Sequence, residues 1–471
     1  MGNFWVSKSV SKSGIKIAIF LFCSCLNASD MSDISHLFRN IGNEKFLNSI
    51  DYSANLTTPD NYTFDSLLSH TLKNSANIAL SKLEVDSSLN ELNYNKSSFY
   101  PEIGISANTE YSKRFDDGYN SIYVGKDNLA SSTSYSNSVS LVLNYDLYTF
   151  GSDSLKVKSS KESIEKAKYE KCAYELETAL KLLDAYYKAL ELKNKIETYE
   201  ALKKAYETLY VYQKRLSGAG EVSKIELGES AMIVADTSYE LNELELNANH
   251  SINLINQITG LKIDDVRKLN GFSMDMTNKE FAKFEDTFIA KKFDYELKAN
   301  EYAKEAEERS YYPTISLYAR YDLYGNDRDN YWQAGRELER HGYRVGLSFY
   351  VSLFDGGKKE ARIKGKEIDS EKIRLQKEVA KLEYEKEVAD LKLFLSSKDK
   401  VGKVLKELDT LSKESYSMQT KLNKAKENSK VDVINSLIVA LKKELSYKEH
   451  ALKAGYNITK ANLMSKQGVC E

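Results

Sequence analysis

Four segments of the chain alternate regularly between apolar and polar residues. They are residues 102–114, 137–149, 314–324 and 342–354. A period of two places successive side chains on opposite faces of a β-strand. Each run is about 10 residues long, the length that a tilted strand needs to cross a bilayer. The pattern fits membrane strands with a wet lumen on their polar side, and it also fits an ordinary antiparallel sheet with one face on a soluble core.

Long segments with helical periodicity separate these strands. Between Tyr169 and Leu190 the apolar residues are spaced by four and three in turn, the period of a coiled coil. Its apolar face is wide, which indicates neighbours on two sides, as in a ring or bundle. In the second half, apolar residues recur every seven positions at Ala361, Ile368, Leu375, Leu382 and Ala389. The predicted helices span residues 64–98, 151–216, 221–260, 285–310, 357–427 and 430–466.

The same landmarks occur twice along the chain, which indicates an internal repeat. Pro101 and Pro313 each follow a charged helical segment, introduce a strand, and lie 212 residues apart. Gly151 and the pair Gly356-Gly357 each stand where a strand gives way to a long helix. We therefore divide the chain into a first repeat at 62–260, a connector at 261–284 and a second repeat at 285–467.

Length supports a common plan for the two halves. The long helices would extend about 100 and 105 Å, and the two shorter helices of each half together come near one long helix. Four strands cannot close a barrel, because single-chain barrels begin at about eight. Several copies must contribute, and three copies would supply twelve strands.

Composition agrees with long helices and membrane strands. The chain of 471 residues has only 3 prolines, 29% charged residues and 33 tyrosines. Solvated helix faces account for the charge, and tyrosine suits a membrane interface, where its ring is buried and its hydroxyl stays wet. The net charge of −2 and the absence of a dominant basic face give no sign of a nucleic-acid partner.

The N-terminus is typical of a secretory signal. Lysines precede an apolar run from Ile15 to Leu26, which is too short to span a bilayer as a helix. We expect residues 1–28 to be a signal peptide cleaved after Ala28, with lipidation of Cys25 as the alternative. Residues 29–61 form a polar extension without an assigned role.

Candidate chemistry is sparse. Cys172 and Cys470 are far apart, so we expect no disulfide framework, and we expect Cys172 to be a small buried apolar residue. Five scattered histidines lack the spacing of metal ligands, and no nucleophile elbow or phosphate loop occurs. We expect no catalytic site, no cofactor and no metal.

The order helix, proline, two strands, glycine, long helix, turn and helix, given twice, resembles the TolC-like outer-membrane efflux proteins over about residues 62–466. Three stretches match most specifically: Leu353 to Lys358, Asp184-Ala185-Tyr186-Tyr187, and Arg215 to Gly220 followed by Ser223. The resemblance implies an α+β membrane protein: a homotrimer with a 12-stranded barrel in the outer membrane and a helical tunnel in the periplasm. It also implies a periplasmic adaptor and an inner-membrane pump as partners. One departure is Phe150-Gly151 at the first junction, where the second has two glycines.

The turns between the helices are the candidate functional positions. By the resemblance, Glu226 and Asp432 would face the periplasmic entrance, with Asn435 where some relatives have a second acid. The alternative is a capping box, since each acid follows a serine by three residues at a helix start. The predicted docking points for the adaptor are Ser217, Gly218, Gly220 and Glu221 in the first turn and Lys426, Asn428 and Lys430 in the second.

Two further interpretations stay open. The same pattern fits a soluble periplasmic or surface coiled-coil protein, whose sheet would pack on its helices. Within the channel interpretation, the cargo could be small molecules for efflux or proteins for type I secretion, because the pump selects the cargo.

Overall fold

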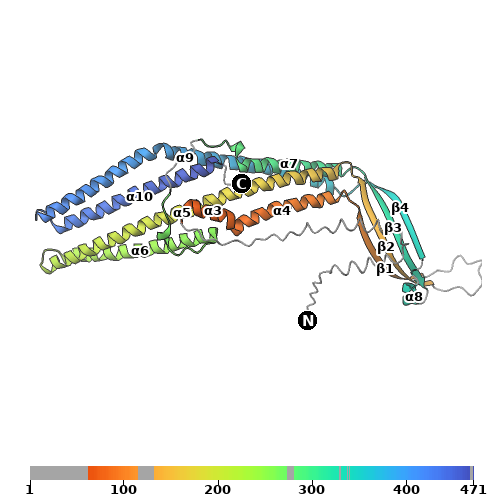
Figure 1. Ribbon diagram of the computed structural model, residues 1–471, viewed down its shortest axis with the longest axis horizontal. Coiled ribbons are helices and arrows are strands. Elements are labelled where there is room, and N and C mark those ends of the chain that lie inside the picture. Colours follow the sequence, from red (N-terminus) through yellow and green to blue (C-terminus); the bar gives the residue numbers. More distant parts are fainter. Residues whose placement is uncertain are drawn as a thin grey trace, which may run out of the picture. The chain divides into compact units, whose positions relative to one another are not determined.

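A computed structural model describes residues 62–114, 132–272, 280–327, 330–336, 338, 340–466 and 470. The predicted signal peptide at 1–28, the extension at 29–61 and most of the first interstrand loop lie outside the described residues. The described chain is a helix-rich α+β fold with one antiparallel sheet of four strands (Figure 1). None of its described helices is long and apolar enough to cross a membrane.

The four strands pair in chain order. They are β1 (Glu102–Arg114), β2 (Ser132–Tyr148), β3 (Thr314–Asp327) and β4 (Arg340–Tyr350). Every neighbouring pair is antiparallel, so β1 and β4 are left as the two edges. Even-numbered residues share the polar face: Ser140 donates to Asp322 directly across the ladder, and Ser316 donates to Asp146. The odd-numbered face carries the apolar residues, as the period of two predicts.

The fourth strand is shorter than predicted. It ends at Tyr350, opposite Thr314, although the alternation continues to Leu353. The residue before Thr314 is Pro313, which has no backbone N–H to extend the ladder. The third strand is longer than the predicted 314–324, because β3 runs to Asp327, and a short helix, α8 (Tyr331–Arg336), follows it.

Two helices of equal length dominate the remainder. They are α5 (Ser152–Gly218) and α9 (Lys358–Lys424), each with 67 residues. The shorter helices are α3 (Phe64–Asn74), α4 (Ala76–Ser97), α6 (Lys224–Thr259), α7 (Phe288–Arg309) and α10 (Lys430–Lys466). The predicted helix 64–98 is therefore two helices, because Ser75 adopts an extended conformation between α3 and α4.

The helices lie side by side in an open row. Among the elements that the structure describes, α5 packs against α4, α6, α7 and α10, whereas α9 packs mainly against α7, α10 and a short connector turn. Nearest the sheet the order is α4, α5, α7, α9, and farther away it is α6, α5, α10, α9 (Figure 1). The row ends on one side at α4 and α6 and on the other side at α9.

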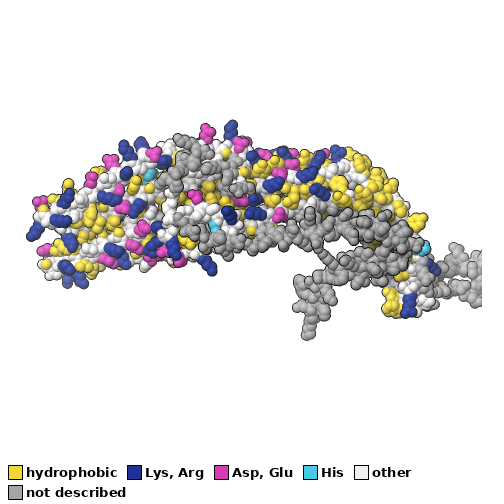
Figure 2. All heavy atoms as spheres, viewed as in Figure 1, with side chains coloured by type: hydrophobic (Ala, Val, Ile, Leu, Met, Phe, Trp, Pro, Cys, Tyr) yellow, Lys and Arg dark blue, Asp and Glu magenta, His cyan; other side chains and the backbone are white. Residues whose placement is uncertain are grey.

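The largest core surrounds the middle of α5. Leu182, Leu183, Tyr186 and Ala189 are fully buried there, against Phe64 and residues of α6. The connector joins this core through Leu261, Ile263, Val266 and Leu269, so it is a packed segment and more than a linker. Hydrophobic side chains are also exposed where the helices meet the strands, while charged side chains follow the helices (Figure 2). Leu353 and Phe354 at that junction are 93% and 89% exposed.

Candidate functional site

The turn between α5 and α6, here called the first tip, ends α5 with a Schellman motif. The N–H of Glu221 donates to the carbonyl of Leu216, and the N–H of Gly220 donates to Ser217. Gly220 has φ of 80°, a left-handed conformation that glycine adopts without steric cost. Helix α5 therefore includes Ser217 and Gly218, which the sequence placed in the turn.

The turn between α9 and α10, here called the second tip, repeats this geometry. The N–H of Glu427 donates to the carbonyl of Leu422, and the N–H of Lys426 donates to Asn423. Lys426 takes the left-handed position with φ of 65°, where the first tip has glycine. Both tips thus end a 67-residue helix in the same way, and the second does so with a residue that prefers another conformation.

Both candidate gate acids complete capping boxes. At the first tip, the amide of Glu226 donates to Ser223 Oγ at 3.1 Å, and the amide of Ser223 donates to Glu226 Oε2 at 3.4 Å. At the second tip, the amide of Asp432 donates to Ser429 Oγ at 3.2 Å, and Ser429 donates to Asp432 Oδ2 through its amide and its hydroxyl. The capping role is confirmed. Both carboxylates stay exposed, as does Asn435, so a role at an entrance remains a prediction.

Some of the residues predicted to dock a partner are exposed, and others are hydrogen-bonded within the tip. Lys426 and Lys430 are exposed, and the Lys430 ammonium lies 5.8 Å from the centre of the Tyr212 ring. Asn428 is half-buried: its side-chain amide donates to Gln419 while its carbonyl accepts from Asn423. Asn428 therefore holds the second tip together and offers little to a partner.

The strand–helix junctions place two successive residues in the left-handed region. Gly356 and Gly357 do so with φ of 73° and 82°. At the first junction Phe150 and Gly151 have φ of 52° and 90°, so phenylalanine takes the place of a glycine. The Phe150 ring stacks on Tyr312 at 5.5 Å, a contact that offsets part of the backbone strain. Tyr312 precedes Pro313, so this stack ties the two halves together beside the sheet.

Asp355 organises the start of α9. Its carboxylate accepts from the amide of Gly357 at 3.0 Å and from the amide of Lys359 at 3.1 Å. Desolvation acts to raise the pKa of Asp355, but these backbone amides prevail and lower it. The sequence marked this stretch by its glycines, and the structure adds the acid as the group that caps the helix.

The Asp184–Tyr187 motif has a structural role. The Tyr186 hydroxyl donates to the carbonyls of Tyr62 and Asn270, and burial raises the pKa of this hydroxyl. Asp184 accepts from the Tyr456 hydroxyl at 2.6 Å, so the motif connects α5 to α10. Together these contacts hold Tyr62, the connector and α10 around one turn of α5.

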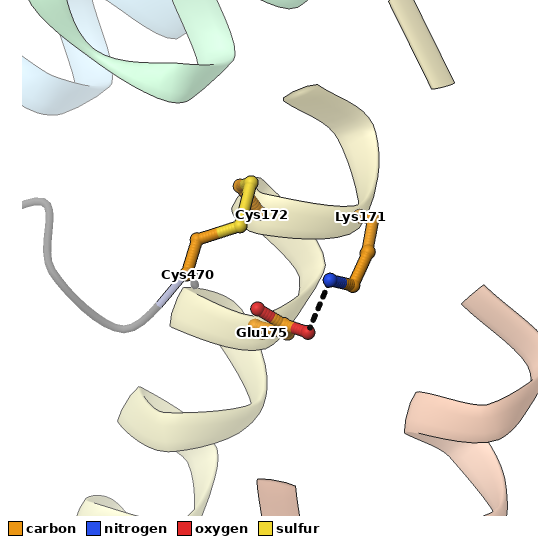
Figure 3. Close-up of a disulfide and its surroundings, with 4 residues drawn as sticks. All are labelled: Lys171, Cys172, Glu175 and Cys470. Carbon is orange, nitrogen blue, oxygen red and sulfur yellow. Dashed lines mark ion pairs between the residues drawn. A yellow bond between two sulfur atoms is a disulfide. The ribbon is translucent and has the colours of Figure 1, made fainter. Parts of the chain in front are cut away.

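Cys172 and Cys470 form a disulfide, which the sequence analysis did not expect. Their Cα atoms lie 5.1 Å apart although 298 residues separate them in sequence (Figure 3). Cys172 is half-buried beside the Lys171–Glu175 ion pair of 3.4 Å and is not the apolar core residue that we predicted. The error arose because sequence spacing carries no information on which residues the fold brings together.

The described residues hold no cluster of three or more His, Cys, Asp or Glu side chains that could bind a metal ion. The charged groups that sequence reasoning missed lie on the sheet. Arg320 and Arg344 both contact Asp322, and alternation alone could not show that these three meet.

Comparisons with known proteins agree with this fold. Residues 67–261 match the family model for outer membrane efflux proteins. The structure resembles the Campylobacter jejuni CmeC outer membrane channel, with a TM-score of 0.70 at 13% identity, covering 86% of this chain and 85% of that one. It also resembles the outer membrane protein VceC of Vibrio cholerae, with a TM-score of 0.67 at 14% identity, covering 85% and 96%.

A third similar structure is the open state of the Neisseria gonorrhoeae MtrE outer membrane channel, with a TM-score of 0.67 at 13% identity, covering 87% of this chain and 89% of that one. A search of curated protein sequences gives no match. At these identities the structures establish the fold, and the family match adds the class of protein. Over residues 67–261 the chain therefore matches the outer membrane efflux protein family, and its fold is that of TolC-like outer membrane channels.

Proposed function

We propose that three copies of this chain form a passive export channel, with a 12-stranded barrel in the outer membrane and a helical tunnel in the periplasm. The family match supports the location and the channel role. The observation that carries the proposal is that the sheet and the helix row of a single chain each have two unpaired edges, which a neighbouring copy could cover.

The sheet has the first pair of such surfaces. β1 and β4 run in opposite directions, so β4 of one copy can pair with β1 of the next in the antiparallel sense. In a membrane an open sheet edge leaves backbone groups without hydrogen bonds, and closure removes that cost. The odd-numbered face, with exposed Val345, Leu347 and Phe349 on β4, is suited to lipid.

The helix row has the second pair. Along α9, Leu375 and Leu382 are 55% and 62% exposed beside α7, and Leu411 and Met418 are 54% and 65% exposed beside α10. Along α6, Met232 and Tyr239 are 60% and 63% exposed. Each pair is seven residues apart, as in the seam of a coiled coil. The row ends at α4 and α6 on one side and at α9 on the other, so α9 of one copy can pack on α4 and α6 of its neighbour, and the ring closes.

The two halves have matching geometry beyond the landmarks of the sequence. Gly220, Ser223 and Glu226 at the first tip correspond to Lys426, Ser429 and Asp432 at the second, each 206 residues later. The long helices begin 206 residues apart as well. We infer that the halves descend from one duplicated unit, so that three chains supply six similar units to the tunnel wall.

Export would require partners at the tips. We propose that the tips dock on a periplasmic adaptor that connects the channel to an inner-membrane pump. Lys421, Lys424, Lys426 and Lys430 make the second tip basic, and an acidic adaptor surface would complement it. Tripartite efflux and type I secretion use such a channel equally, and the pump would decide the cargo.

The exposed acids at the tips would then surround the entrance. In a trimer, Glu226 and Asp432 each form a ring of three carboxylates, which attracts cations. The Glu226→Gln/Asp432→Asn variant should lower cation selectivity in planar bilayers. The control is Ser223→Ala/Ser429→Ala, which weakens both caps and keeps both acids. Equal selectivity of the wild type and the first variant would exclude the gate.

The channel itself is tested by assembly. Leu375→Glu should abolish the oligomer seen when unheated protein is run on a gel, because it places a charge in the α9 seam. Gln376→Glu, one residue along and outside the stripe, adds the same charge and should leave the oligomer intact. If the protein is extracted without detergent, as a monomer that gives no conductance in bilayers, it is a soluble coiled-coil protein and the proposed channel is excluded.

A further inference from the structure

The polar face of the sheet carries a cluster with excess positive charge beside the β4 edge. Asp322 accepts from Ser140 at 2.6 Å and from Arg320 at 2.5 Å, and its other oxygen lies 3.3 Å from Arg344. One carboxylate is thus shared by two guanidinium groups. The Arg344 side chain stands on the edge strand and is 69% exposed.

The β1 edge carries an acid on the same face. Glu110 lies four residues after Ser106, which pairs with Ser140, so all three side chains point to the polar side. Glu110 is exposed and forms no ion pair with another side chain that the structure describes. The β4 edge therefore carries an arginine whose carboxylate is shared with a second arginine. The β1 edge carries a glutamate with no ion-pair partner among the described side chains.

The two edge strands are staggered along the ladder. Within one copy, Arg344 is level with Arg320, Val142 and Gly104. At the outer end β4 stops at Arg340, level with Asn108, while β1 continues to Arg114. Pairing the whole of β4 with β1 of a neighbour therefore needs an offset of four to six residues. A barrel requires such a stagger because its strands are tilted.

The alternation of polar and apolar side chains limits which of these offsets is possible. An odd offset would put the polar side chains of one strand on the lipid face of the next, so only four or six is acceptable. At an offset of six, Arg344 stands directly opposite Glu110 of the neighbouring copy. At an offset of four, Gly342 stands opposite Glu110, and Arg344 is its diagonal neighbour. Opposite and diagonal positions are separated by roughly 5 and 7–8 Å, within reach of these long side chains.

We propose that Arg344 of one copy pairs with Glu110 of the next on the lumen side of each seam, and that this pair selects the register in which the barrel closes. The inference rests on the proposed trimeric barrel and adds the register and the residues that fix it. The chemistry that recognises the β4 edge is a second copy of this chain, through opposite charge on one face and unpaired backbone groups along the strand.

Cysteine cross-linking tests the register. On the lipid face, an offset of four puts Ala107 opposite Val345 of the neighbour, and an offset of six puts it opposite Leu347. Oxidation of Ala107→Cys/Val345→Cys or of Ala107→Cys/Leu347→Cys should therefore give covalent oligomers on a non-reducing gel. Ala107→Cys/Gly346→Cys, which requires the odd offset, is the matched control and should give none. Cross-linking of the control alone would overturn the register.

Charge substitution tests the pair. Glu110→Lys should lower the temperature at which the unheated trimer dissociates, by clearly more than Glu102→Lys, the same change on the same strand and face. In a double-mutant cycle, the Arg344→Gln/Glu110→Gln variant should lower this dissociation temperature no further than the more harmful of the two single substitutions does. Additive effects in a trimer that still forms and conducts would exclude the ion pair and leave the channel standing. If the wild-type protein forms no oligomer at all, the proposed channel itself is excluded.

Discussion

Helices α5 and α9 are equal in length, begin after the same kind of junction and end in the same kind of turn, yet they differ in burial. Helix α5 buries side chains from Ser152 to Leu209. Helix α9 buries only Ile373, Leu391, Asp409 and Ser412, and its regular apolar positions Ile368, Leu375 and Leu382 are exposed. The difference follows from position, since α5 lies inside the row of helices and α9 lies at its end. In the proposed trimer, the exposed apolar stripe of α9 is the surface on which a neighbouring copy would pack.

Truncating one leucine in α5 and one in α9 should give the largest difference between the two long helices. Leu183→Ala should lower the free energy of unfolding by about 2–5 kcal/mol, because Leu183 is fully buried in the main core. Leu382→Ala should leave the unfolding of a separated copy almost unchanged and reduce the amount of trimer. Denaturant titration and unheated gels measure the two effects. Equal losses of unfolding free energy would contradict the assigned difference.

The disulfide tethers only the first long helix. Cys172→Ser/Cys470→Ser should lower the free energy of unfolding by about 2–4 kcal/mol in non-reducing buffer, because the bond closes a very long loop in the unfolded chain. Reductant should have the same effect on the wild type and none on the double variant. If reductant leaves wild-type stability unchanged, the bond contributes nothing.

Each long helix also binds its neighbouring segment through a tyrosine. Tyr186→Phe should cost about 1–3 kcal/mol, because it removes a hydroxyl on a fully buried side chain that bonds the carbonyls of both Tyr62 and Asn270. Tyr384 of α9 donates only to the carbonyl of Ala282, at 2.7 Å and half-buried, so Tyr384→Phe should cost about 0.5–1.5 kcal/mol. Denaturant midpoints rank the two, and the reverse order would show that α9 holds its connector more firmly.

The tips differ in one residue at the left-handed position. Gly220→Lys should destabilise the first tip by about 1 kcal/mol, whereas Lys426→Gly should relieve strain at the second by a smaller amount. Hydrogen exchange of the Glu221 and Glu427 amides reports each turn directly. Slower exchange of Glu427 in Lys426→Gly is the expected sign, and faster exchange would refute the strain.

The smallest effect is a pH dependence at the α5–α7 contact. Burial acts to raise the pKa of Glu170, but Lys292 at 2.9 Å and Lys166 at 3.3 Å prevail and lower it below 4.5. Because the folded-state pKa is depressed, this stabilisation is present above the unfolded pKa and is lost as pH falls through the folded one. Glu170→Gln should be less stable at neutral pH by under about 1 kcal/mol and nearly equal to wild type in acid. A difference that persists in acid would contradict the ionic origin.

Much of the local structure was predictable because local rules decide it. Pro101 and Pro313 introduce strands, Gly220 ends a helix, and Ser223 with Glu226 starts the next, each through backbone geometry that a few residues determine. Two local predictions were wrong, at the end of the fourth strand and within the first helix. β4 stops early because Pro313 lies beside it, and the helix at 64–98 breaks at Ser75.

By itself, the sequence determined the order of strands and helices, the faces of each strand and the turns at the tips, because periodicity and turn chemistry act over a few residues. Only the tertiary structure decided that Cys172 meets Cys470, that Asp322 is shared by Arg320 and Arg344, and that one long helix is enclosed while its counterpart lies at the edge. Such contacts join residues far apart in the chain, and the entropy of closing the chain between them is recovered only when the whole fold forms.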